Sequence, residues 1–226
     1  MSRQFIQKFQ KLLQITRGKK MQVQNNIQYG IYLRQKANSI AKELFRKSIH
    51  ICSSFVPLCL GFAYYPTLWL LVSALLGYTV CEFLRLKGVS IPLVSKITEV
   101  AARKRDENRF VLGPVTLVVG IILAALILPP ACAKVGIFAL AFGDGLASLS
   151  GKLIGRITIP GSHGKTVAGS LTCFIAVYIA TFYCSQNCYA SLLTGCAAMF
   201  LEMLPLSDFD NVLIPVTIGL FFGFVI

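Results

Sequence analysis

The sequence lacks paired-cysteine motifs, histidine clusters and internal repeats. Its eight cysteines form no CxxC pair and only two histidines occur, so we interpret the cysteines as small buried hydrophobic residues. Cys184 and Cys188 flank a predicted external turn, which leaves a disulfide open in an oxidising compartment. The absence of a repeat gives no support to the paired-half architecture of many transporters. We expect no signal peptide, because the first long apolar run begins near Ile49 and no small-residue cleavage site precedes it.

The composition is that of a membrane protein. The 226 residues have a mean hydropathy of +0.69 and are 55% hydrophobic, which is too apolar for a soluble domain. The net charge of +13 comes from basic residues between apolar runs. This distribution indicates an anionic membrane surface as partner and argues against nucleic acid.

Seven apolar runs approach the length that spans a bilayer, and they predict an all-α polytopic membrane protein with about seven transmembrane helices. The runs are 49–65, 66–84, 110–128, 131–149, 166–184, 189–206 and 211–226. We therefore divide the chain into a basic arm at 1–47 and a transmembrane domain at 48–226. Apolar residues at helical spacing within 5–13 predict an amphipathic interfacial helix in that arm.

Basic residues in the loops predict the orientation. The 1–47 arm holds eleven, the 85–109 loop seven and the 150–165 loop three, whereas Lys134 is the single basic residue near the other face. Because positive loops stay inside, we predict a cytosolic N-terminus. The acidic residues within the runs then fall at cytosolic ends, where one pocket can gather them with the bases.

The segment 142–170 is the densest in glycine and polar residues. Glycines permit close backbone approach, bases neutralise phosphate and an acid can hold a metal, so we predict a phosphate-binding site. Its residues are Gly143, Asp144, Gly145, Gly151, Lys152, Gly155 and Arg156. The alternative is that the glycines pack helices and the bases reach the membrane surface.

The stretch GSHGKT at 161–166 resembles a Walker A loop only in part. That loop requires glycine at 159, where this chain has Ile159, and no strand precedes it. Lys165 and Thr166 still suit a triphosphate, because they begin a predicted helix whose N-terminus attracts anions. We predict that Gly164 and Ser170 also take part in binding the triphosphate. The alternative for Lys165 is an anchor at the membrane surface.

A late acidic cluster predicts either a Mg²⁺ site or a solvated polar turn. It consists of Glu202, Asp208, Asp210 and Asn211. We interpret His163 as a loop residue, and the role of His50 stays open because it follows Arg46 and Lys47 closely.

Five motifs in order resemble the family of dolichol kinases, phytol kinases and CTP-dependent diacylglycerol kinases. They are FRKSIH at 45–50, ENRFVLGPVTL at 107–117, GDGLASLSGKLIG at 143–155, GKTVAGS at 164–170 and DFDN at 208–211. The resemblance covers about residues 44–226. It implies CTP as phosphoryl donor, a divalent metal and a lipid hydroxyl as acceptor. Arg46, Lys47, Asp144 and Gly151 fall on positions characteristic of the diacylglycerol-kinase branch, so diacylglycerol is the preferred acceptor, with polyprenol or phytol as alternatives.

The sequence departs from the family at two points. Ala168 stands where an acidic residue is common, so the role of that residue does not transfer. Polyprenol kinases are usually longer, which argues against dolichol itself as substrate. The related CDP-diacylglycerol synthases share the Asp, basic-loop and Lys-Thr pattern, but the DFDN ending favours a kinase over a phosphatidate cytidylyltransferase. A small transporter or lipid-binding protein is the third alternative.

These observations predict a division of roles for phosphoryl transfer at the cytosolic face of a bacterial inner membrane or of the endoplasmic reticulum. Asp144 with Asp208 or Asp210 holds Mg²⁺, and Glu202 is a further candidate ligand. Asp210 is preferred over Glu202 to orient the acceptor hydroxyl. Arg46 and Lys47 close the site, and the phosphate oxygens are bound by Lys152, Arg156, Lys165 and Thr166.

Overall fold

The computed structural model describes residues 3–89, 98, 109–162 and 164–226, with side chains from residue 24 onward. The chain forms two units, Met1–Ala41 and Lys42–Ile226. The first belongs to helix α1 (Arg3–Cys52). The second unit therefore begins before the predicted domain boundary at 48, because the last turns of α1 pack with it through Glu43 and Lys47. The predicted interfacial residues 5–13 are helical, but their side chains lie outside the described part.

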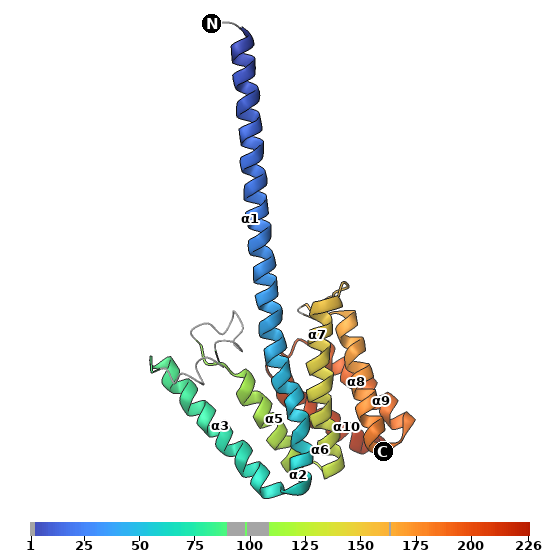
Figure 1. Cartoon of the computed structure of the whole chain (residues 1–226). Coiled ribbons are helices and arrows are strands. Elements are labelled where there is room, and N and C mark those ends of the chain that lie inside the picture. Colours follow the sequence, from blue (N-terminus) through green and yellow to red (C-terminus); the bar gives the residue numbers. More distant parts are fainter. Residues whose placement is uncertain (1–2, 90–97, 99–108, 163) are drawn as a thin grey trace. The chain divides into compact units, whose positions relative to one another are not determined.

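The elements that follow α1 in the described residues are helices, drawn in Figure 1, and these residues contain no β-strand. The elements are η1 (Ser53–Phe55), α2 (Val56–Phe62), α3 (Tyr64–Leu86), α5 (Gly113–Ile127), α6 (Pro130–Phe138), η3 (Ala139–Asp144), α7 (Gly145–Ile154), α8 (Val167–Ser185), α9 (Cys188–Met203) and α10 (Asp210–Val225). The segment η3 is a π-helical turn between α6 and α7, a feature often found at functional sites. The all-helical prediction is confirmed for the described residues.

One helical rod, Pro130–Ile154, forms the centre of the second unit. It comprises α6, η3 and α7, and 67% of its most apolar window is buried, against 6% for α3. α8 packs on α7 and η3, while α10 packs on α5, α6 and α9. Figure 1 shows α7 and α8 side by side. A central helix is buried by its neighbours and an outer one is not, so the apolar side chains of α3 stay largely exposed.

Small residues bring α10 close to α5 and to α6 of the central rod. A Cβ atom on Gly136 would overlap the backbone carbonyl of Pro215, and one on Gly120 would overlap that of Asn211. Such close backbone contact is typical of helix packing in membranes. Asn187 begins α9 by accepting hydrogen bonds from the N–H groups of Tyr189 (3.0 Å) and Ala190 (3.1 Å), which satisfies donors that a helix start leaves free.

Three helices are long and apolar enough to cross a membrane: Tyr64–Leu86, Pro130–Ile154 and Val167–Ser185. The shorter apolar helices α5, α9 and α10 accompany them. This composition is compatible with a membrane protein, while the seven spans and their orientation stay predictions. The predicted run at 49–65 is not one helix, because α1, η1 and α2 succeed one another and the helical pattern ends at Phe62.

Two further boundaries differ from those predicted. Pro66 lies in the first turn of α3 and does not separate two helices, since proline lacks only an N–H that is unpaired at that position. The predicted 150–165 loop begins at Gly155, so Lys152 is helical. All eight cysteines, including Cys184 and Cys188, have free thiols.

Candidate functional site

A polar cavity of about 390 Å³ lies in the second unit. The end of α1, the rod at η3 and α7, the start of α8, and the junction of α9 with α10 form its walls. Of the predicted site residues it collects Arg46, Lys47, Asp144, Gly151, Lys152, Gly164, Lys165, Thr166, Ser170, Glu202 and Asp210. Residues distant in sequence thus share one cavity.

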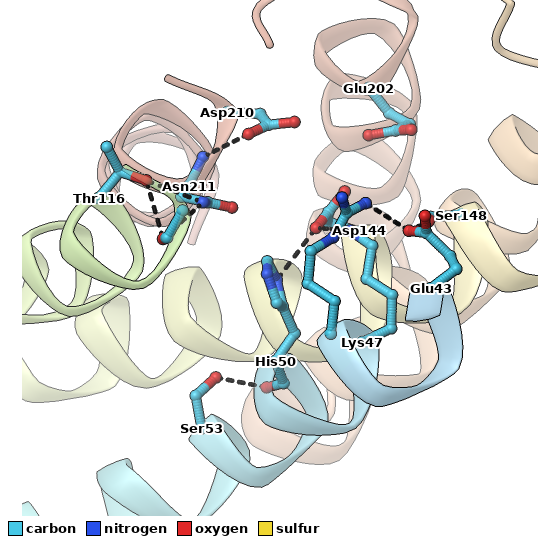
Figure 2. A network of polar contacts seen from close by, with 12 residues as sticks. Glu43, Lys47, His50, Ser53, Thr116, Asp144, Ser148, Glu202, Asp210 and Asn211 are labelled. Atoms are coloured by element: carbon cyan, nitrogen blue, oxygen red, sulfur yellow. Dashed lines mark hydrogen bonds and ion pairs between the residues drawn. The ribbon is translucent and has the colours of Figure 1, made fainter. Parts of the chain in front are cut away.

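Asp144 anchors the cavity wall through an ion pair with α1. Asp144 and Lys47 are both only 3% exposed, and Lys47 Nζ donates a hydrogen bond to Asp144 Oδ2. His50 Nδ1 lies 3.1 Å from the same oxygen without the alignment of a hydrogen bond. Figure 2 shows Lys47 and His50 on one helix, both directed at Asp144. Two groups therefore compensate the buried carboxylate, as its burial requires.

Glu43, one turn before Lys47, joins α1 to α7. Its carboxylate accepts hydrogen bonds from Arg46, from Ser148 Oγ at 2.6 Å and from Lys152 Nζ. Burial acts to raise the pKa of Glu43, but Arg46, Lys152 and Ser148 outweigh it and lower the pKa to about 2. Glu43 therefore stays ionised and holds two cations at the cavity wall.

A tight turn between α7 and α8 places Lys165 and Thr166. The N–H of Ile159 donates to the Lys165 carbonyl over 2.8 Å, and Gly161 and Gly164 adopt φ values of 78° and 92°, which favour glycine. Thr166 caps α8 by accepting from the Gly169 N–H at 3.2 Å. The N-terminus of α8 and Lys165 thus meet at the cavity, and both attract anions.

Three lining residues carry buried polar atoms that have no hydrogen-bond partner within the described part of the chain. They are Arg46 Nε, Ser170 Oγ and Glu202 Oε2. Lys165 Nζ lies 3.4 Å from Glu202 Oε2, but it donates its hydrogen bond to the Glu202 backbone carbonyl. Because an unpartnered buried polar atom costs free energy, two donors and an acceptor at one cavity indicate a polar ligand.

Five predicted site residues do not line the cavity. Arg156 is exposed and Asp208 half-buried. Gly143 faces Val177, and Gly145 faces Ile51, while a side chain on Gly155 would collide with Thr166. The glycines thus serve helix packing, the alternative that the sequence left open. His163 lies outside the described residues.

Two other polar groups tie helices together away from the cavity. Glu82 is fully buried and accepts hydrogen bonds from Arg85 and, at 2.9 Å, from the Val111 N–H. Asn211 Nδ2 donates to Thr116 Oγ1 at 2.9 Å, which links α10 to α5 (Figure 2). Asn211 thereby acts in packing and is not among the residues lining the cavity.

The carboxylates at the cavity match one of the ways in which proteins hold Mg²⁺. Within the described residues no three His, Cys, Asp or Glu side chains come together as a metal cluster. Glu202 and Asp210 nevertheless line the same cavity from α9 and α10. Mg²⁺ commonly takes one or two carboxylates, with phosphate oxygens and water completing its octahedron. The residues present fit that mode.

Sequence reasoning missed Glu43, Ser148 and Ser162, which also line the cavity. Glu43 had a detectable signal, because it is the only acidic residue before Glu82 and lies one turn from Arg46 and Lys47. Ser148 and Ser162 had no detectable signal, since serine is common in helices and turns of this kind.

No family model, curated protein or solved structure matches this chain. The resemblance to the lipid-kinase family therefore stays a prediction from the five motifs.

Proposed function

We propose that this protein transfers the terminal phosphoryl group of a nucleoside triphosphate to the hydroxyl of a membrane lipid. One observation carries the proposal: the cavity joins cations and a helix N-terminus to unpartnered buried donors and a carboxylate. Phosphoryl transfer depends mainly on positioning and charge stabilisation, and these groups supply both.

The phosphate oxygens are bound by the cationic side of the cavity. Lys152 and Lys165 offer ammonium groups, and Arg46 Nε and Ser170 Oγ offer donors without partners in the described chain. Thr166 begins α8, whose first N–H groups point toward its N-terminus. A cavity of about 390 Å³ is at the small end of ligand sites. It suits the reacting phosphates and leaves the lipid chains outside.

Glu202 is assigned to the acceptor hydroxyl, in place of Asp210, which the sequence favoured. Asp210 Oδ1 already accepts the Asn211 N–H at 2.9 Å, whereas Glu202 Oε2 is buried, accepts no hydrogen bond within the described chain and lies 3.4 Å from Lys165 Nζ. The lipid oxygen attacks the γ-phosphorus, the bond to the β-phosphate oxygen breaks, and nucleoside diphosphate leaves. Glu202 accepts the hydroxyl proton. Asp210, with the phosphates, would hold Mg²⁺, which reduces the charge on the phosphate oxygens when bound.

The Lys47–Asp144 pair is assigned to positioning. Asp144 Oδ2 accepts from Lys47 and faces His50, so its charge is compensated without a ligand. The pair fixes α1 against η3 and thereby holds Arg46 and Glu43 at the cavity. CTP as donor, diacylglycerol as acceptor and the cytosolic location follow from the resemblance and the basic loops.

The test is a labelled-phosphate assay on the full chain in detergent. Purified protein receives Mg²⁺ and γ-labelled CTP or ATP, with diacylglycerol, a short polyprenol, phytol or phosphatidate in separate reactions. Label is expected on a lipid alcohol, at a rate that Glu202→Gln lowers about 100-fold. Lys165→Gln is expected to raise the KM for nucleotide. The matched control is Lys87→Gln, because Lys87 is exposed and does not line the cavity.

Other outcomes would assign a different function. CDP-lipid formed from phosphatidate, with label released as pyrophosphate, would identify a cytidylyltransferase. No turnover of any of the four lipids would refute the enzymatic proposal and favour transport or lipid binding. Full activity in Glu202→Gln would refute the role of that carboxylate alone.

A further inference from the structure

A second, larger cavity lies at the other end of the central rod. Its volume is about 1000 Å³, the upper part of the range typical of ligand sites. α2 and the start of α6 form most of it, with Phe142 of η3 and Tyr183 of α8. Its walls are mainly leucine, phenylalanine, alanine and proline, so they offer van der Waals contact and few hydrogen bonds.

Lys134 is the only charged residue among those described as lining this cavity. Its Nζ lies 5.8 Å from the ring centre of Phe138 and 5.9 Å from that of Tyr183, distances at which aromatic rings attract a cation. The cavity lining contains no carboxylate. A lysine held by two rings at an apolar wall, without a counter-ion there, offers its charge to an anion.

The position of Lys134 along the rod matches the level of a lipid headgroup. Lys134 and Lys152, at the polar cavity, lie on the same rod and are separated by about 27 Å at the usual helical rise. This is close to the roughly 30 Å thickness of a hydrocarbon core. If Lys152 lies at one membrane surface, Lys134 therefore lies near the opposite one. The apolar wall between them then lies at the depth of the acyl chains.

We propose that this cavity binds an anionic phospholipid, with the phosphate at Lys134 and an acyl chain along α2 and α6. Charge complementarity selects the occupant, because a lining with one cation and no carboxylate attracts a phosphate. The aromatic and leucine side chains of the lining pack against an acyl chain. The site is separate from the polar cavity, and its existence does not depend on the proposed phosphoryl transfer.

Lipid retention measured by native mass spectrometry tests this proposal. The full chain in detergent receives equal amounts of phosphatidylglycerol and phosphatidylcholine with identical acyl chains. The natural protein is expected to retain phosphatidylglycerol preferentially. Lys134→Gln is expected to lower that retention about tenfold, because a charge-assisted contact is lost. Retention of phosphatidylcholine should fall less, because the choline of that lipid already neutralises its phosphate. Lys134→Arg should keep the preference.

Two further variants separate charge from shape. Lys87→Gln is the matched control, because Lys87 Nζ also lies over a phenylalanine ring, at 4.9 Å from the Phe83 centre, but outside the cavity. It should retain both lipids normally. Gly61 lines the cavity and has free space beside it, so Gly61→Leu should fold and lower the retention of both lipids.

Three results would overturn the proposal. They are equal retention of the two lipids by the natural protein, an undiminished preference in Lys134→Gln, and an equal loss in Lys87→Gln. In a second mixture of phosphatidylglycerol and oleate, stronger retention of oleate would also overturn the proposal and assign the cavity to a free fatty acid. If Lys134→Gln does not fold, the natural protein and Gly61→Leu decide between these outcomes.

Discussion

Replacing Lys47 by methionine tests whether the buried ion pair organises the polar cavity. Lys47 and Asp144 are each 3% exposed and are joined by a hydrogen bond. Methionine keeps most of the length of the side chain but removes the charge, so the Asp144 carboxylate is left with His50 Nδ1, 3.1 Å away. The substitution thus removes the main compensation of a buried charge and little packing volume.

The expected loss of stability is large. Removing one partner of a buried ion pair costs about 3–5 kcal/mol, and each kcal/mol lowers the melting temperature of a chain of this size by about 2–4 °C. Lys47→Met should therefore melt about 10 °C below the natural protein. Asp144→Asn should also destabilise, because it leaves Lys47 buried without its carboxylate. The double variant should recover most of the loss, since it removes both charges.

Far-ultraviolet circular dichroism in detergent measures the melting of all four proteins, and the phosphate assay measures their activity. We expect recovery of stability in the double variant without recovery of activity, because the neutral pair no longer holds α1 in register. Natural stability in Lys47→Met would refute the reasoning. A double variant whose loss equals the sum of the two single losses would refute it as well.

Three further predictions concern residues around the site and in the core. Glu43 has a pKa of about 2 against an ordinary value of 4.5, so its stabilisation is complete above 4.5 and is lost as the pH falls toward 2. Glu43→Gln should therefore melt lower at neutral pH, and the gap to the natural protein should close on acidification; a gap independent of pH would contradict this. Gly136→Ala should destabilise by at least about 1–3 kcal/mol, because its Cβ would overlap the Pro215 carbonyl. The control Gly77→Ala meets open space and should be neutral or slightly stabilising in chemical denaturation, and similar losses in both would refute the packing argument. Thr166→Val removes the cap of α8 and should cost about 1 kcal/mol in the same measurement. Thr166→Ser keeps the hydroxyl and should therefore retain the natural stability. Equal losses of stability in the serine and valine variants would show that the Thr166 hydroxyl does not stabilise α8 as a cap.

The sequence predicted most residues of the polar cavity because their chemistry is rare in apolar runs. Asp144, Lys165 and Glu202 stood out as charges at the ends of such runs, and all three line the cavity. It did not predict which side chains would pair. Asp144 was expected to hold a metal, and that role stays a prediction. In the structure its Oδ2 accepts a hydrogen bond from Lys47, a residue 97 positions earlier in the chain.

Boundaries were less predictable where a loop motif and a helix motif overlap. The glycines and bases after Ser150 suggested a loop, yet α7 continues to Ile154, and the Gly155 N–H donates to the Gly151 carbonyl at 3.1 Å. Arg156 consequently projects from the turn beyond the helix, exposed and away from the cavity lining.

By itself, the sequence determined the helical class and the apolar segments, because hydropathy and periodicity are local properties of the chain. It also concentrated glycine, basic and acidic residues into a few short motifs. Only the tertiary structure decided that Glu43 joins these motifs, that Gly143 and Gly145 pack helices, and that Lys134 faces an apolar cavity. Those outcomes depend on which helix faces meet, and no single segment of the sequence carries that information.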